Sequence, residues 1–157
     1  MKLTIQRIET NYPYDLLLQA DETREGIDKY LFDSEVYVAH IPECDEPVGV
    51  FCLLRNDEDT IELMNIAVDK PYRGKGIGGL MIEKATRIAA EKGYHEIILG
   101  TGTEDCAPDQ IRFYERHGFR KSYLRENYFT EKYPEPIIEN GVQLKDMQVL
   151  ARPTQII

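Results

Sequence analysis

The stretch Ile61-Glu62-Leu63-Met64-Asn65-Ile66-Ala67-Val68, followed after a short turn by Arg73-Gly74-Lys75-Gly76-Ile77-Gly78-Gly79, decides how this chain folds. The first part is apolar at nearly every position, which predicts a strand over Thr60–Val68 that is buried on both faces and central in its sheet. Beyond the glycines, apolar residues recur at helical spacing as far as Gly93, a residue suited to follow the end of a helix. We therefore expect a central strand, a glycine-rich loop and a long amphipathic helix in succession.

The segments on either side of this stretch predict a mixed sheet. Two further strands, Glu35–Ile41 and Pro47–Leu54, precede the central one, and their connectors are too short for parallel crossovers. Ile97–Leu99 predicts a strand after the long helix, which gives one parallel βαβ crossover. The other expected elements are a strand in Lys2–Ile8, one or two helices in Tyr14–Phe32 that Gly26 would divide, a helix at Gln110–His117, and strands at Phe119–Arg125 and Val142–Leu150.

This order of elements predicts the fold class. It is an α/β chain with a mostly antiparallel central sheet, one parallel crossover and flanking helices. Neither a doubly wound parallel sheet nor an all-β fold has that order. At 157 residues the chain is expected to form one domain over residues 1–157.

The composition limits the classes of function. Acidic residues number 28 and basic residues 19, and the net charge of −9 argues against a nucleic-acid partner. No apolar run approaches the roughly 20 residues of a membrane helix, and the N-terminus lacks the apolar core of a signal peptide. The cysteines lie in no metal-like spacing, and the three histidines are spread along the chain. We therefore expect a cytoplasmic protein with free thiols, no metal and no membrane contact.

The glycine-rich loop is the strongest chemical signal. Glycines let main-chain N–H groups approach an anion, and the start of the following helix adds partial positive charge. Arg73 and Lys75 contribute formal charge, so the loop suits a pyrophosphate. A P-loop is excluded because no Lys-Ser or Lys-Thr follows a glycine here. A dinucleotide-binding turn fits poorly because three successive strands, from Glu35 to Val68, lie directly before the loop. A tight turn with incidental glycines is the plain alternative.

A family resemblance favours one interpretation of the loop. Arg73-x-x-Gly76-x-Gly78 resembles the coenzyme pyrophosphate loop of the GNAT acetyltransferases. Forty residues after Arg73, Phe113-Tyr114-Glu115-Arg116-His117-Gly118-Phe119 resembles the aromatic-Tyr-x-x-x-Gly-Phe segment of the same family. The resemblance implies the acyl-CoA N-acyltransferase (GNAT) fold and an N-acetyltransferase that uses acetyl-CoA. A sensor that binds acetyl-CoA without turnover is the alternative.

The resemblance also assigns site residues. It implies that main-chain groups of Ile66, Ala67 and Val68 hold the pantetheine arm. It places the pyrophosphate on the loop that follows, at Arg73, Gly74, Lys75, Gly76, Ile77, Gly78 and Gly79. Many family members also carry an Asn near Ala107, and here Asp109 or Gln110 would have to take its place.

Two residues are candidates for proton transfer. Tyr114 matches the family tyrosine near the coenzyme sulfur, and a phenol stays protonated at neutral pH and can donate to a thiolate. Glu62 is the candidate base, because a carboxylate on a strand buried on both faces is costly unless it is functional or paired. Asn65, an odd number of residues away, is expected on the opposite sheet face and in a structural role. Cys106 is a further candidate nucleophile, since it lies in the loop before the predicted helix Gln110–His117, near where the thioester is expected.

The acceptor class stays open between a small-molecule amine, a protein α-amine and a lysine side chain. Acidic side chains would attract a cationic amine before it loses its proton. The candidates are Glu22, Asp28, Asp33, Glu104, Asp105, Glu126, Glu131, Glu135 and Glu139, and a solvated acidic surface is the plain alternative. The insertion Glu126–Gly141 is expected to be an ordered lid or a subunit contact. The resemblance is also compatible with a homodimer or a higher homo-oligomer.

Overall fold

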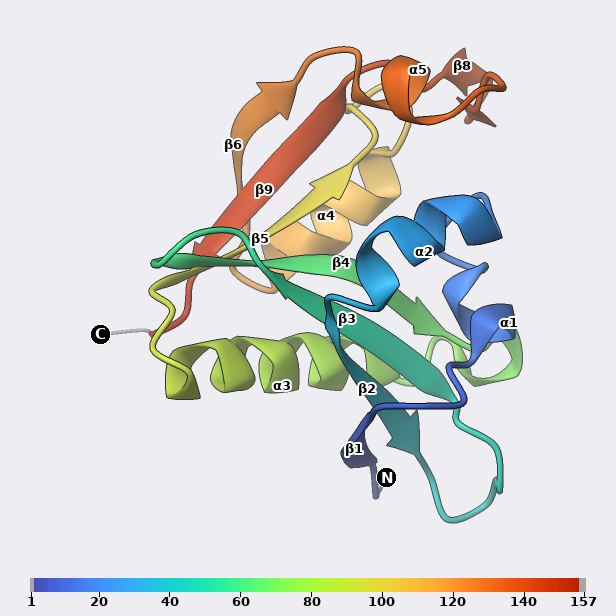
Figure 1. The fold of residues 1–157 in the computed structure, drawn as a ribbon, viewed down its shortest axis with the longest axis vertical. Coiled ribbons are helices and arrows are strands. Elements are labelled where there is room, and N and C mark those ends of the chain that lie inside the picture. The colour runs from blue at the N-terminus through green and yellow to red at the C-terminus, as the bar shows by residue number, and fades with distance from the viewer. Residues whose placement is uncertain (1, 156–157) are drawn as a thin grey trace.

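Seven strands form one sheet in the structure, a computed structural model that describes residues 2–155. Their order across the sheet is β1-β2-β3-β4-β5-β9-β6 (Figure 1). Every pair of neighbours is antiparallel except β4 and β5. The predicted fold class is therefore confirmed. The strands are β1 (Thr4–Ile8), β2 (Glu35–His40), β3 (Gly49–Arg55), β4 (Thr60–Val68), β5 (Glu96–Thr101), β6 (Arg120–Arg125) and β9 (Met147–Pro153).

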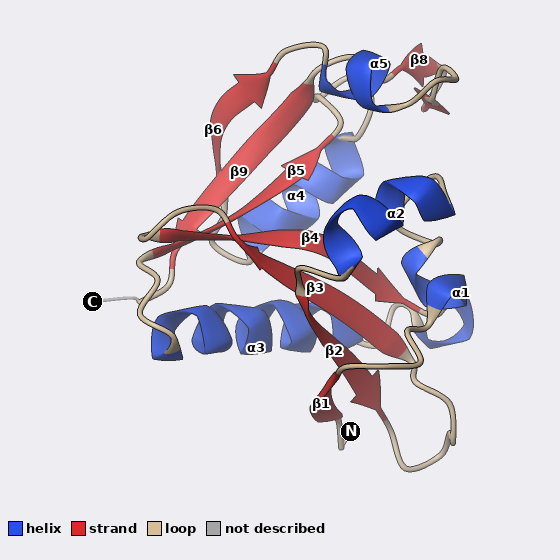
Figure 2. Cartoon of the chain, in the orientation of Figure 1, coloured by secondary structure: helices blue, strands red, loops and turns tan. Residues whose placement is uncertain are grey.

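Helices cover both faces of the sheet (Figure 2). On one face, α3 (Ile77–Glu91) and α4 (Pro108–Arg116) pack on a core that includes Phe51, Leu63 and Phe119. On the other face, α1 (Tyr14–Leu17) and α2 (Arg24–Leu31) cover a smaller core around Val50. The short helix η1 (Lys70–Tyr72) joins β4 to the glycine loop. The strand β4 thus lies between two apolar layers, as its sequence predicts.

The parallel pair β4 and β5 diverges along its length. Thr60–Glu62 pair with Glu96–Ile98, and no pairing continues beyond Glu62 (Figure 1). The main chain of β4 from Leu63 onward therefore has no β5 neighbour to bond. A strand edge left open inside a sheet can bond an extended ligand as though it were another strand.

One extra residue in β4 changes which side chains share a face. Asn65 pairs with Cys52 of β3, and Leu63 pairs with Leu53, so Met64 is a bulge residue without a partner. Because Glu62 pairs with Leu54, two positions from Cys52, Glu62 and Asn65 project from the same face. The expectation that they lie on opposite faces is wrong, since alternation holds only within an unbroken strand.

The N-terminal helices break at a different place from the expected one. Gly26 lies inside α2, and the break falls between Leu17 and Arg24. The Oγ1 of Thr23 accepts a hydrogen bond from the Gly26 amide at 3.0 Å, so Thr23 caps the helix that Gly26 belongs to.

The predicted strand Val142–Leu150 is two strands. Its first residues form β8 (Val142–Gln143), which pairs with β7 (Ile138–Glu139) in a separate hairpin. The main-chain carbonyl of Lys145 then accepts a hydrogen bond from the Phe129 amide, and the carboxylate of Asp146 accepts one from the Asn127 amide. These bonds tie the segment to α5 (Tyr128–Lys132) before β9 begins. The insertion is thus ordered, as the sequence predicts.

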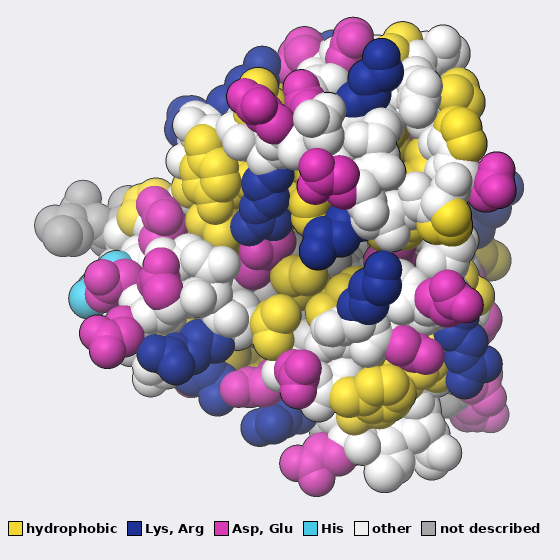
Figure 3. Space-filling view, turned by 45° about the horizontal axis from the view of Figure 1, so that its top comes forward, with side chains coloured by type: hydrophobic (Ala, Val, Ile, Leu, Met, Phe, Trp, Pro, Cys, Tyr) yellow, Lys and Arg dark blue, Asp and Glu magenta, His cyan; other side chains and the backbone are white. Residues whose placement is uncertain are grey.

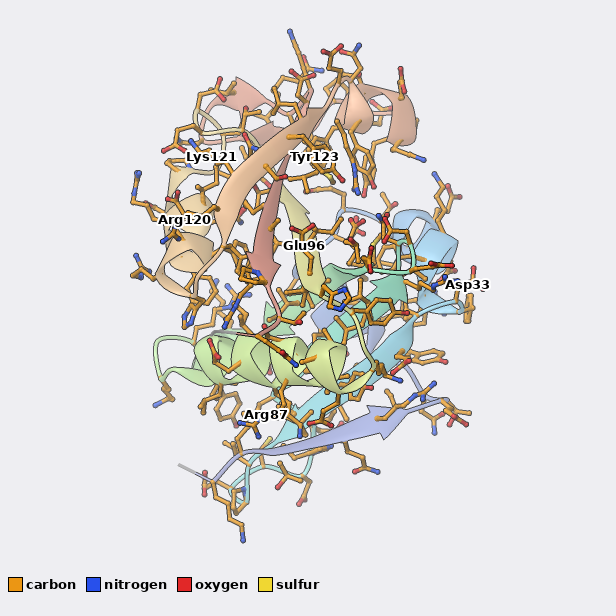
Figure 4. All side chains as sticks on the ribbon, turned by 90° about the vertical axis from the view of Figure 1, so that its left-hand side faces the viewer. Asp33, Arg87, Glu96, Arg120, Lys121 and Tyr123 are labelled. Carbon is orange, nitrogen blue, oxygen red and sulfur yellow. The ribbon has the colours of Figure 1, made fainter. Side chains whose placement is uncertain are left out.

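The edge strand β6 is mostly exposed. Figure 4 shows Arg120, Lys121 and Tyr123 along it. Charged side chains on an edge oppose pairing with another strand. None of the helices between residues 2 and 155 is long and apolar enough to cross a membrane.

Candidate active site

A cleft opens where β4 and β5 diverge. The predicted pantetheine residues Ile66, Ala67 and Val68 line it, together with Arg73 and Tyr114. Leu99, Gly100 and Thr101 of β5 form the opposite side. The divergence therefore brings together the predicted strand, loop and helix residues, although the last of them is forty-eight positions from the first.

The glycine loop has the geometry of an anion cradle at two positions. Gly74 and Gly76 have φ of +77° and +83°, a region that favours glycine, and an added Cβ at either would meet nothing within 4 Å. Gly76 is also the N-cap of α3, so the unpaired amides of that helix begin beside it. The open loop, the helix start and the unpaired β4 edge together fit a pyrophosphate joined to an extended arm.

The next two glycines have a second task. A Cβ on Gly79 would lie 2.7 Å from Cε1 of His117, and one on Gly78 would lie 3.3 Å from Cζ of Phe113. Both positions therefore allow α3 to pack closely on α4. The sequence analysis assigned all four glycines to the anion. The packing of α3 on α4 shows that Gly78 and Gly79 are also needed for close contact between the helices, whereas Gly74 and Gly76 are not.

Arg73 lines the cleft and is held there by two hydrogen bonds. Its Nε donates to the Val68 carbonyl at 2.8 Å, and its Nη2 donates to Oε1 of Gln19 at 2.6 Å. Gln19 in turn donates from Nε2 to Asp69 at 3.0 Å. The Val68 carbonyl is thus already bonded here, and Gln19 is a cleft residue that the sequence did not reveal.

Tyr114 reaches the cleft from α4. Its ring packs edge-on against Phe113 and Phe119, at centroid distances of 5.3 and 5.9 Å. Within the described part of the chain its hydroxyl makes no hydrogen bond, and burial raises the pKa of the phenol from 10.0 to about 12. The hydroxyl therefore remains a proton donor throughout the neutral range.

A second pocket adjoins the cleft on the α2 side of the sheet. Its lining comes from the loop before α2, from β4 and β5, and from the insertion, which includes Tyr128 and Tyr133. Ala20, Leu63, Met64, Gly100, Thr101 and Gln110 line both cavities. The two cavities therefore meet beside the β4 bulge, and we refer to the second one as the acceptor pocket. Gln110, one of the two expected substitutes for the family Asn, lies at this junction.

Glu62 lies in the acceptor pocket and is paired. Its Oε1 and Oε2 accept hydrogen bonds from Nη2 and Nη1 of Arg125 at 2.8 and 2.9 Å. Only 9% of the Glu62 side chain and 25% of the Arg125 side chain are exposed. The carboxylate keeps the arginine charged, and this interaction raises the pKa of Arg125. The buried carboxylate expected from the sequence therefore has a partner 63 positions away, which no local pattern reveals.

Asn65 has a structural role, as expected. Its Nδ2 donates to the Leu17 carbonyl at 3.1 Å and to the Tyr30 hydroxyl at 3.0 Å. That hydroxyl donates to Asp21, which also accepts from the Tyr133 hydroxyl at 2.7 Å. The network fixes the insertion to the loop before α2, directly above the acceptor pocket.

Several candidates lie outside both cavities. Cys106 is 4% exposed, lines neither cavity and has its pKa raised by burial, so it is poorly suited to be a nucleophile. Glu104 is engaged with Arg112 and Lys121, and Asp28 accepts from Tyr14. Of the acidic candidates, only Glu22 and Glu139 line the acceptor pocket. Among residues 2–155, no group of three or more His, Cys, Asp or Glu side chains could hold a metal ion.

Known proteins with similar sequences and folds identify the family to which this chain belongs. The sequence model of the acetyltransferase (GNAT) family matches residues 4–119. The chain belongs to the GNAT acetyltransferase family. An uncharacterized N-acetyltransferase of Bacillus subtilis, YvbK, is 37% identical over 134 residues, which is 85% of this chain and 84% of that protein.

Two solved structures agree in fold. A GNAT family acetyltransferase from Elizabethkingia anophelis with acetyl-CoA bound is 38% identical, with a TM-score of 0.90 over 96% of this chain and 97% of that chain. A Bacillus subtilis acetyltransferase in complex with CoA is 36% identical, with a TM-score of 0.87 over 97% and 99%. Both of these relatives hold the coenzyme, or its acetylated form, that the sequence resemblance implies.

Proposed function

We propose that this GNAT chain moves the acetyl group of acetyl-CoA to a primary amine by direct attack, without a covalent enzyme intermediate. The observation that supports this proposal is the meeting of two cavities at the β4 bulge. One carries the coenzyme features and Tyr114, and the other carries Glu62. Two substrates held in adjoining cavities can react directly where the cavities join.

Tyr114 is proposed to protonate the leaving thiolate. Because burial raises the pKa of this phenol to about 12, above the ~8.5 of an ordinary thiol, the phenol stays protonated and donates a hydrogen bond to the sulfur as negative charge develops there. The coenzyme supplies the activated acetyl group, and the proton that the sulfur finally needs is the one the attacking amine gives up, with any proton that leaves Tyr114 returned to it from that source. Its free hydroxyl and its position in the cleft support this role.

Glu62 is proposed to receive the proton of the attacking amine, directly or through one water. Arg125 holds both carboxylate oxygens and so fixes the orientation of the group, while each oxygen keeps a further lone pair. The plain alternative is that the pair only anchors β6 to β4. The acceptor is a small-molecule amine or a protein amine.

The proposal is tested by measuring CoA thiol release from acetyl-CoA over a panel of amines, with isothermal titration of acetyl-CoA alongside. Tyr114→Phe keeps the ring packing and removes only the hydroxyl. It should lower kcat by roughly 10- to 10⁴-fold, up to the full value of a general acid, with acetyl-CoA affinity little changed. Tight acetyl-CoA binding without thiol release for any amine would instead favour a non-catalytic sensor.

A further inference from the structure

Two basic side chains, Lys29 and Lys132, line the acceptor pocket. Lys29 of α2 and Lys132 of α5 lie together, since Nζ of Lys29 is 3.4 Å from the main-chain oxygen of Lys132. Nζ of Lys132 stands 5.8 Å from the centroid of the Tyr128 ring, and Cζ of Arg125 stands 6.0 Å from the same centroid. Arg125 and Lys132 therefore both lie beside the Tyr128 ring, and Lys29 reaches the end of α5 that carries Lys132. We call this set the basic wall.

The two lysines of the basic wall are unpaired. Arg125 forms an ion pair with Glu62, whereas Lys29 and Lys132 form no ion pair with any residue between 2 and 155. Figure 3 shows Lys and Arg side chains on both sides of the hollow that separates the upper and lower parts of the molecule. In a chain with a net charge of −9, two neighbouring lysines without a carboxylate partner present a local positive site.

Acidic groups line the same pocket. Asp21 is occupied by the two tyrosine hydroxyls, and Glu22 follows it directly. Burial and, after it, the charge of Glu22 raise the pKa of Glu139, so the Glu22 carboxylate lies close enough to act on Glu139. Tyr133, which lies between α5 and β7 in the chain, donates one of these hydrogen bonds to Asp21. The pocket therefore offers both cationic and anionic side chains to a single occupant.

We propose that the acceptor is an amine that also carries a carboxylate, an amino-acid-type substrate whose carboxylate faces Lys29 and Lys132. This inference rests on the proposed function, and it names the substrate class of the same site. A simple alkylamine or diamine would leave the lysine pair unused and would be repelled by it. An amino acid uses both kinds of side chain, since its ammonium is drawn by the carboxylates before deprotonation and its carboxylate is held by the lysines.

The test compares acceptors that differ only in the carboxylate. The kcat/KM for thiol release is measured for L-leucine, L-phenylalanine and L-aspartate, each against its α-carboxamide. For each protein, kcat/KM with the acid is divided by kcat/KM with its amide. This acid-to-amide ratio is then compared between wild type and a variant, so that the intrinsic reactivity of the amine cancels. Because both lysines are exposed, Lys29→Gln and Lys132→Gln should each lower the acid-to-amide ratio about two- to fivefold, and about tenfold together. Lys145→Gln makes the same charge change on an exposed side chain outside the pocket and should leave the ratio unchanged.

A binding measurement separates this inference from the proposed function. With CoA present, millimolar amino acid should raise the Tm of wild type more than its amide does, and the Lys29→Gln/Lys132→Gln variant should lose that difference. If no amine is acetylated but the Tm difference and its loss are seen, the proposed function fails and the carboxylate site stands. If amides are acetylated as well as acids and the lysine variants leave the ratio unchanged, the carboxylate site is refuted and the transferase stands.

Discussion

Replacing Arg125 by methionine should destabilise the protein more than any exposed charge substitution. The Glu62 side chain is 9% exposed and both of its oxygens bond the guanidinium, at 2.8 and 2.9 Å. Methionine retains the packing of the stem near Met147 while removing the charge. Breaking a buried pair by removing one partner costs about 3–5 kcal/mol, because the other charge stays buried without compensation.

The exposure of the arginine places the expected loss at the lower end of that range. Since 25% of its side chain is in contact with water, we expect about 3 kcal/mol. For a domain of this size that corresponds to a fall in Tm of roughly 6–12 °C. A typical domain stability of about 5–15 kcal/mol leaves the variant folded at 25 °C. Thermal and urea unfolding followed by circular dichroism measure both quantities.

A double-mutant cycle isolates the pair itself. Glu62→Gln should cost less than Arg125→Met, because the arginine it leaves behind can reach water. The double variant should be more stable than the sum of the single losses predicts, by roughly 1–3 kcal/mol. Arg112→Met breaks an ion pair whose side chains are 56% and 49% exposed and should barely move the midpoint. Single losses that simply add, or an Arg125→Met midpoint no lower than that of Arg112→Met, would refute the reasoning.

Three further predictions concern the site. Glu62→Gln should depress kcat/KM most below the pKa of the amine and lose its effect as pH rises, because the free amine then appears unaided; a constant ratio to wild type at every pH would leave Glu62 an anchor only. Gly76→Val should weaken acetyl-CoA binding in isothermal titration, since φ is +83° there, while Gly93→Val at the other end of α3, with φ of +91°, should strain the fold without changing affinity. Burial raises the pKa of Tyr114 to about 12, so the stability it confers is complete below pH 10 and is lost as pH rises toward 12. Between pH 9 and pH 11, wild type should therefore lose about 1 kcal/mol more unfolding free energy than Tyr114→Phe, and equal losses in urea would contradict the shift.

The sequence alone determined the parts of this protein that depend on local pattern. The buried strand Thr60–Val68 has the predicted bounds, and the helix that follows the glycine loop begins at Ile77, because periodicity and glycine placement act over a few residues. The same local signals predicted a coenzyme loop at Arg73–Gly79 and singled out the segment around Tyr114, and the family resemblance followed from these two motifs. The element order then required one parallel pair between antiparallel ones.

Only the tertiary structure decided how the acceptor side is built. The bulge at Met64 depends on pairing with β3, and that one residue puts Glu62 and Asn65 on the same face. The partner of Glu62 comes from β6, which reaches the site only because β9 lies between β5 and β6 in the sheet. The lysine pair joins α2 to an insertion a hundred residues later. Such contacts arise from how strands and layers are stacked, and a side chain's charge or polarity in the sequence does not say which distant group will come to lie beside it.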